Sequence, residues 1–218
     1  MTPDQGAAIY DPVKEAEGRP WLRRLNYLQD ALLVCVSALF FYAQVVAVTR
    51  GNFLSVAFAA EQAILVALFL FRRRSRATSR RPFDWIVAAG GFLPLLARPN
   101  EGDGSLALAG FILQTGGFFL VVAGMLALGR SFGVVAANRG LKVSGPYRVV
   151  RHPIYLAHII STGGYVMTNF SYWNLAIYLA TATCHLLRIR AEERVLTLTD
   201  SYADYARRVR WRLIPGLY

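Results

Sequence analysis

Residues 106–128 read LALAGFILQTGGFFLVVAGMLAL, without one charged side chain. A helix that crosses a bilayer needs about 20 consecutive apolar residues, and this stretch meets that requirement. Five more apolar segments occur at 28–48, 53–71, 83–97, 153–170 and 172–189. The sequence therefore predicts an all-α, polytopic integral membrane protein with five to six transmembrane helices. Segment 83–97 is short and interrupted by Gly90, Gly91 and Pro94, which predicts either a bent span or a re-entrant helix.

The composition supports a membrane protein and excludes several other classes. Of the 218 residues, 55% are hydrophobic and 17% are charged, which excludes a disordered chain. The formal net charge is +11, but the basic residues separate apolar segments instead of clustering on one element. We therefore expect no nucleic-acid partner. Cys35 and Cys184 lie inside apolar segments without metal-ligand spacing, so no metal site is expected. The polar first 27 residues do not resemble a cleavable signal peptide.

The basic residues also predict the orientation in the membrane. If the N-terminus is cytoplasmic and six segments cross, all of the 24 Lys and Arg residues except Arg50 and Arg98 lie on the cytoplasmic side. This agrees with the positive-inside rule at every loop. Both termini are then cytoplasmic. The arginine-rich stretch 72–81 is interpreted as a solvated loop against anionic membrane lipids.

Residues whose side chains could bind a ligand or take part in a reaction are concentrated in SGPYRVVRHPIY, residues 144–155. Pro153 suits the first position of a helix, which places His152 at the N-cap beside free backbone N–H groups. Together with Arg151, these groups predict an anion site at the start of the helix. Tyr155 lies in the first turn of the helix and should face the same site. The alternative interpretation is a His-Pro helix start that Arg and Tyr anchor at the membrane interface.

A second polar stretch, RIRAEER, occupies residues 188–194. Segments 153–170 and 172–189 are joined by a short link and should form an antiparallel hairpin, which returns Glu192 and Glu193 to the side of His152. The alternative is a solvated helix turn in which the two carboxylates pair with neighbouring arginines. A zwitterionic or polyhydroxylated cofactor would fit this membrane edge, because it gathers a carboxylate, a histidine, basic side chains and turn N–H groups.

One carboxylate lies inside a predicted span. Glu61 is in segment 53–71, and an intramembrane carboxylate is costly and is a functional candidate by default. The alternative is a buried structural Glu, paired with Gln62 or a neighbouring helix. Arg151 and Glu61 are the candidates for catalytic residues, and His158 is a further candidate base for an amine acceptor.

An ordered set of motifs resembles a known family. The motifs are Leu128-Gly129-Arg130-Ser131-Phe132, Gly145-Pro146-Tyr147, Arg151-His152-Pro153-x-Tyr155, Glu192-Glu193-x-x-Leu196 and the closing Tyr202-x-x-Tyr205-x-x-x-Val209-x-x-Arg212-Leu213-x-Pro215-Gly216. In this order they resemble the isoprenylcysteine carboxyl methyltransferases, particularly their bacterial branch, and the related phospholipid methyltransferases. The resemblance covers residues 106–218, a methyltransferase core, and leaves 1–105 as a tail with accessory transmembrane helices.

The resemblance implies methyl transfer from S-adenosylmethionine to a lipophilic membrane-embedded acceptor, a carboxylate, amine or thiol, in a bacterial inner membrane. It implies cofactor contacts at Lys142, Val143, Gly145, Tyr147, His152, Pro153, Tyr155, Glu192 and Glu193. Two features depart from the family. Ala157 stands where the family often has Gly, which narrows either a helix crossing or the cofactor slot. Segment 106–128 offers no cation to an acceptor carboxylate.

Two other functions are compatible with the sequence. The first is an NADPH-dependent membrane reductase of the sterol-reductase type, which shares part of the C-terminal architecture. The second is a non-catalytic membrane scaffold that keeps the motifs for folding alone.

Overall fold

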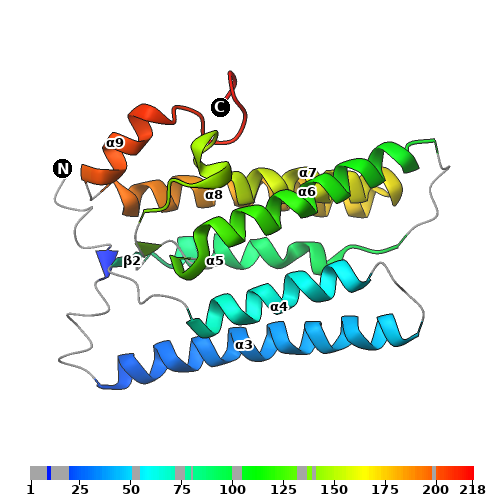
Figure 1. Ribbon diagram of the computed structural model, residues 1–218, viewed down its shortest axis with the longest axis horizontal. Helices are drawn as coiled ribbons and strands as arrows, with labels where there is room; N and C mark the ends of the chain where they lie inside the picture. Colours follow the sequence, from blue (N-terminus) through cyan, green and yellow to red (C-terminus); the bar gives the residue numbers. More distant parts are fainter. Residues whose placement is uncertain are drawn as a thin grey trace.

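The computed structural model describes residues 9–10, 20–50, 55–71, 77–79, 81–99, 105–131, 137–138, 141–197 and 200–218. Long helices lie side by side and form most of the structure (Figure 1). The first half of the chain contains β1 (Ile9–Tyr10), α3 (Pro20–Thr49), α4 (Ser55–Phe71), β2 (Ala77–Ser79), α5 (Pro82–Ala89) and the 3-10 helix η1 (Gly90–Leu96). The second half begins with α6 (Ala107–Leu128), the 3-10 helix η2 (Gly129–Ser131), β3 (Ala137–Asn138) and the 3-10 helix η3 (Gly145–Arg148). It ends with α7 (Pro153–Thr168), α8 (Tyr172–Leu196) and α9 (Asp200–Arg208). The predicted helical fold is confirmed.

A small antiparallel sheet ties distant parts of the chain together at one end of the helices. Its strand order is β1-β2-β3, with Ile9 opposite Ser79 and Ala77 opposite Asn138. Strand β2 lies within the arginine-rich stretch 72–81. Part of that stretch is therefore paired with other segments.

Small residues let α6 and α7 approach closely. Gly110, Gly117 and Gly124 recur every seven residues on α6. A Cβ at Gly117 would lie 2.7 Å from the backbone nitrogen of Ser161 and 2.8 Å from the carbonyl oxygen of Ala157. Ala157 is 0% exposed in this contact. Small residues at a helix crossing are typical of helices that pack in membranes. Ala157 packs in this crossing with Val121, Met125 and Ile154.

The interrupted segment 83–97 forms α5 and η1, which run antiparallel along α8. At one end, Nη2 of Arg194 donates to both carboxylate oxygens of Asp84 at 2.8 Å. At the other end, the N–H of Arg98 donates to Oδ1 of Asn174 at 2.9 Å. Asn174 and Arg194 are about 30 Å apart along α8, at 1.5 Å per residue. The 3-10 helix rises about 2.0 Å per residue, more than an α-helix, so the short segment formed by α5 and η1 is long enough to cover these 30 Å. The segment therefore runs as an extended rod along α8 and does not fold back as a re-entrant hairpin.

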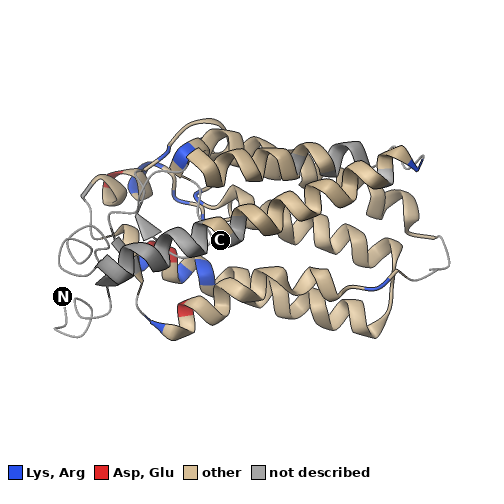
Figure 2. Cartoon of the chain, turned by 90° about the horizontal axis from the view of Figure 1, so that it is seen from below, with Lys and Arg blue, Asp and Glu red and all other residues tan. Residues whose placement is uncertain are grey.

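The apolar helices differ in whether they are long enough to cross a membrane. In the described part of the chain, one helical stretch, Ala107–Ser131, is long and apolar enough to cross a membrane by its length and composition. Shorter apolar helical stretches occur at Val34–Val46, Gln62–Phe71 and Pro82–Leu96. The predicted count of five to six crossings stays a prediction. Figure 2 shows most of the Lys and Arg residues at one end of the helices and a long middle section without them.

Candidate functional site

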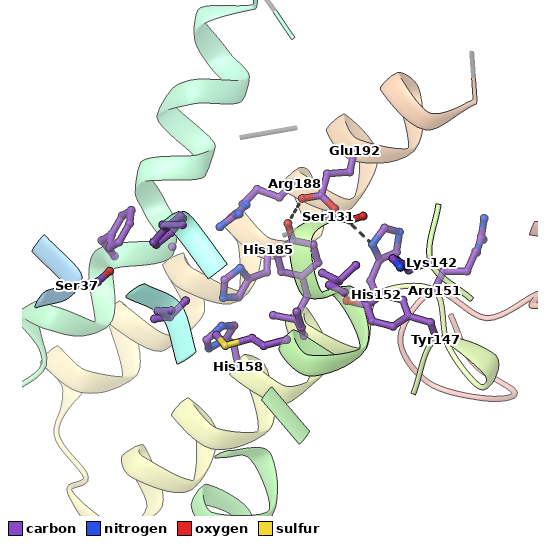
Figure 3. Close-up of a pocket in the computed structure, with 18 of the residues that line it drawn as sticks. Ser37, Ser131, Lys142, Tyr147, Arg151, His152, His158, His185, Arg188 and Glu192 are labelled. Atoms are coloured by element: carbon purple, nitrogen blue, oxygen red, sulfur yellow. Dashed lines mark hydrogen bonds and ion pairs between the residues drawn. The ribbon is translucent and has the colours of Figure 1, made fainter. Parts of the chain in front are cut away.

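A cavity of about 410 Å³ lies among α3, α4, η1, α6, α7, α8 and α9. On one side it is lined by polar residues: Lys142, Tyr147, Arg151, His152, Glu192 and Tyr202. Its apolar lining comes largely from other elements: Val36, Phe40, Leu65, Phe69, Phe92 and Leu95. Figure 3 shows Lys142 and Arg151 on one side of this cavity, Ser37 of α3 on the other, and His158 and His185 between them. The cavity therefore joins a charged region to an apolar one.

The helical hairpin brings the two predicted polar stretches together. Helices α7 and α8 are joined by residues 169–171, as the sequence predicted. The Tyr155 hydroxyl donates to Oε1 of Glu192, and Nδ1 of His152 lies 3.8 Å from Oε2 of Glu192. His152 is the N-cap residue of α7, but its side chain makes no capping hydrogen bond. It is 6% exposed and lines the cavity.

Glu193 has a different environment from Glu192. Its Oε1 accepts from the Tyr202 hydroxyl at 3.1 Å and lies 2.9 Å from Nη1 of Arg151 and 3.3 Å from Nε2 of His152. Its Oε2 accepts from Nε of Arg212 at 2.8 Å. Burial by itself raises the pKa of Glu193, but the hydrogen bonds from His152 and Arg212 and the charge of Arg151 lower it to about 2. Glu193 is therefore ionised at neutral pH. Unlike Glu192, it does not line the cavity.

The C-terminal tail folds back over the start of α7. The N–H groups of Arg151 and His152 donate to the carbonyl oxygens of Trp211 and Arg212, both at 2.9 Å. The Tyr205 hydroxyl donates to the carbonyl oxygen of Tyr147 at 2.8 Å. Burial raises the pKa of Tyr205 to about 12, so this hydroxyl keeps its proton at neutral pH. The tail is therefore a wall of the site.

The remaining predicted site residues divide into two groups. Lys142, Tyr147 and Arg151 line the cavity together with His152, Tyr155 and Glu192. The other group does not line it: Val143 is exposed, Gly145 begins η3 with a φ of 58°, and Pro153 is buried as the first residue of α7. The side chain of Glu61, on α4, lies outside the described part of the structure.

Sequence reasoning assigned no role to several residues that line the cavity. Tyr202 and Tyr205 belong to the closing motif, and their spacing in that motif is the sequence signal that points to them. His185 and Arg188 also line the cavity, beside His158. Arg188 begins the polar stretch 188–194, but it was expected there only as a partner for the two carboxylates, and His185 lies inside the predicted span 172–189. Among the described residues, no group of three or more His, Cys, Asp or Glu could hold a metal ion.

The comparison with known families agrees with the position of this site. Residues 106–203 match the model of the phospholipid methyltransferase family. The matched region begins at the N-terminus of α6 and ends in α9, so it contains both polar stretches and the hairpin between them. The resemblance to this group of methyltransferases is confirmed over this region. No curated protein sequence matches the chain.

Proposed function

We propose that the protein transfers a methyl group from S-adenosylmethionine to a lipophilic acceptor that enters from the membrane. The observation that carries this proposal is a cavity that joins a charged region, built from the matched motifs, to an apolar region built mainly from α3, α4 and η1. A methyltransferase of this kind has to hold a polar donor and an apolar acceptor side by side.

The charged region suits the cofactor chemically. Lys142 and Arg151 offer cationic donors to an α-carboxylate, and Nε of Arg151 is a buried donor with no hydrogen-bond partner in the described structure. Glu192 offers carboxylate oxygens to a ribose diol or an α-ammonium group, held in place by Tyr155 and His152. The bound cofactor would supply a methyl group already activated by its sulfonium.

The chain itself needs to position the acceptor and exclude water. Tyr202 and Tyr205 of the tail close the charged region, and burial raises the pKa of both hydroxyls, so they remain neutral donors. Alignment of two bound groups removes much of the entropic barrier of a bimolecular reaction. The proposal therefore assigns binding and orientation to this site, without a covalent enzyme intermediate.

The apolar region suits an acceptor with a hydrocarbon chain. Exposed large apolar side chains occur on α3, α4 and α6 and include Leu39, Leu70, Leu108, Ile112, Phe119 and Leu126. Apolar surfaces of this extent are typical of contact with lipid. The proposal places the helices in a bacterial inner membrane, with both termini and the charged end in the cytoplasm.

Calorimetry with S-adenosylhomocysteine on the detergent-purified protein tests this function. We expect saturable binding that His152→Ala weakens and Arg190→Ala leaves unchanged. Arg190 is an exposed residue at the same end of α8 and does not line the cavity. Binding of NADPH without a response to the sulfur compound would overturn the proposal in favour of a reductase. Binding of neither compound would favour a scaffold.

A further inference from the structure

We propose that residues 207–217 form a membrane-contact surface that binds anionic lipids, and that this contact holds the C-terminal tail in place over the site. The inference rests on the proposed function, which places the helices in a membrane and the cofactor in the charged region. It adds a partner, the anionic lipids of the leaflet at the charged end. It also adds a dependence of cofactor binding on those lipids.

The tail ends in a tight turn that exposes large apolar side chains. The N–H of Leu217 donates to the carbonyl oxygen of Ile214 at 3.1 Å, across Pro215 and Gly216. Gly216 has a φ of 84°, as the third residue of a type II turn requires. A Cβ at Gly216 would meet none of the described residues within 4 Å, so the tip of the turn projects away from the helices. Trp211 is 37% exposed, Ile214 43% and Leu217 76%.

The same part of the chain is basic. Residues 205–218 contain four arginines and no Asp or Glu. Two of these arginines have acidic partners in the structure. The other two, Arg208 and Arg210, are exposed and closely precede Trp211. An apolar surface bordered by cations matches the boundary of an anionic leaflet, where acyl chains lie beneath negatively charged headgroups.

The position of the turn agrees with this partner. Figure 1 shows the red C-terminal turn projecting from the side of the helices, close to α9. The backbone of the tail is bonded to residues 151 and 152, directly before the apolar segment 153–170. With the helices across a bilayer, a side projection at this level meets the boundary between headgroups and acyl chains. Trp is enriched at that boundary, and apolar segments with basic neighbours bind there.

The inward face of the same segment builds the site. The carbonyl oxygen of Trp211 accepts from the N–H of Arg151 at 2.9 Å, and Nη2 of Arg151 donates to the carbonyl oxygen of Arg210 at 3.3 Å. Leu213 is 4% exposed and packs against Tyr155. A partner that binds the tail only in this position stabilises this position. Lipid contact and cofactor binding therefore favour the same arrangement of the tail, and each should strengthen the other.

A fluorophore at Leu217 measures the lipid contact. In a variant without the native cysteines, we would label Leu217→Cys with bimane and reconstitute the full chain in nanodiscs of equal amounts of phosphatidylcholine and phosphatidylglycerol. One lipid at a time carries bromine on its acyl chains and quenches bimane on contact. We expect quenching at position 217, and more from brominated phosphatidylglycerol than from brominated phosphatidylcholine. Ser201→Cys, at the exposed start of α9, is the matched control and should show little quenching.

Two arginine variants test the role of charge. The preference for phosphatidylglycerol at position 217 should fall by about 5-fold for each of Arg208→Gln and Arg210→Gln, the effect of one basic residue near an anionic surface. Arg190→Gln, an exposed arginine near the end of α8, should leave the preference unchanged. The three arginines lie outside the cavity lining, so these substitutions leave the cofactor contacts in place.

Calorimetry in the same nanodiscs tests the link to the site. S-adenosylhomocysteine should bind the wild-type protein about 5-fold more tightly with phosphatidylglycerol than in phosphatidylcholine alone, the lower end of typical coupling between two sites. The double variant Arg208→Gln, Arg210→Gln should bind it with the same affinity in both kinds of nanodisc.

Three results would overturn the inference. If position 217 is quenched no more than position 201, the lipid contact fails and an acidic protein becomes the better partner for this surface. Equal quenching by the two brominated lipids would exclude the anionic preference. Equal affinity of the wild-type protein for S-adenosylhomocysteine in both kinds of nanodisc would exclude the coupling. If that compound binds in neither, the proposed function fails, whereas quenching at position 217 still decides the lipid contact.

Discussion

Replacement of Glu193 by Gln should destabilise the protein mainly by removing one charge. Glu193 is only 9% exposed, and its carboxylate is surrounded by Arg151, His152, Tyr202 and Arg212. These contacts join α8 to the start of α7 and to the C-terminal tail. An amide keeps one acceptor oxygen, but its NH₂ group then faces the donors that the second oxygen bound. We expect a lower melting temperature and, because Arg151 and His152 lose their fixed partner, weaker cofactor binding.

The pKa of Glu193 gives the magnitude. A pKa of about 2 in the folded protein, against 4.5 for an ordinary Glu, corresponds to about 3 kcal/mol of stability. The folded pKa is the lower one, so this stability is fully present above about pH 4.5 and is lost as the pH falls towards about 2. For a chain of this size, about 3 kcal/mol corresponds to roughly 6–12 °C in melting temperature.

Circular dichroism melts in detergent from pH 7 to pH 3 measure this effect. Glu193→Gln should melt below the wild-type protein at pH 7, and the difference should shrink as the pH falls below 4.5. Asp204→Asn is the matched control, since the Asp204–Arg207 pair is exposed and a surface pair contributes little. Equal melting temperatures of the Gln variant and the wild type at pH 7 would refute the reasoning.

Three further results are expected. His152→Ala should weaken S-adenosylhomocysteine binding about 10- to 100-fold in calorimetry, because this side chain lines the cavity. It should lower the melting temperature less than Glu193→Gln does, because it removes only one of the contacts of Glu193; wild-type affinity would contradict the site. Gly117→Ala should lower the melting temperature, because its Cβ would meet the backbone of α7, whereas Gly116→Ala, with nothing within 4 Å, should keep or raise it; equal effects would contradict the close crossing. In a variant without the native cysteines, single cysteines at Ser75 and Ser105 should be labelled from opposite sides of the membrane; labelling from the same side would contradict six crossings.

The sequence could predict those parts of the cavity lining that are brought together by short segments of the chain. His152 and Tyr155 are separated by one helical turn, and a three-residue link returns α8 to them. The hairpin therefore placed Glu192 near Tyr155 without any long-range contact. The sequence could not distinguish Glu192 from its neighbour Glu193, because the two carboxylates differ only in what the tail and α7 offer them.

By itself, the sequence determined the apolar segments that form α3 to α8, their order and the pairing of α7 with α8, because long apolar segments and short links leave a helical chain few alternatives. It did not predict α9 or the start of α3 at Pro20. Only the tertiary structure decided the partners of Glu193, the course of α5 and η1 along α8, and the contact of the tail with the start of α7. Each of these depends on contacts between segments far apart in the sequence. Such contacts are set by shape and close approach, as at Gly91 and Gly117, which periodicity and charge do not encode.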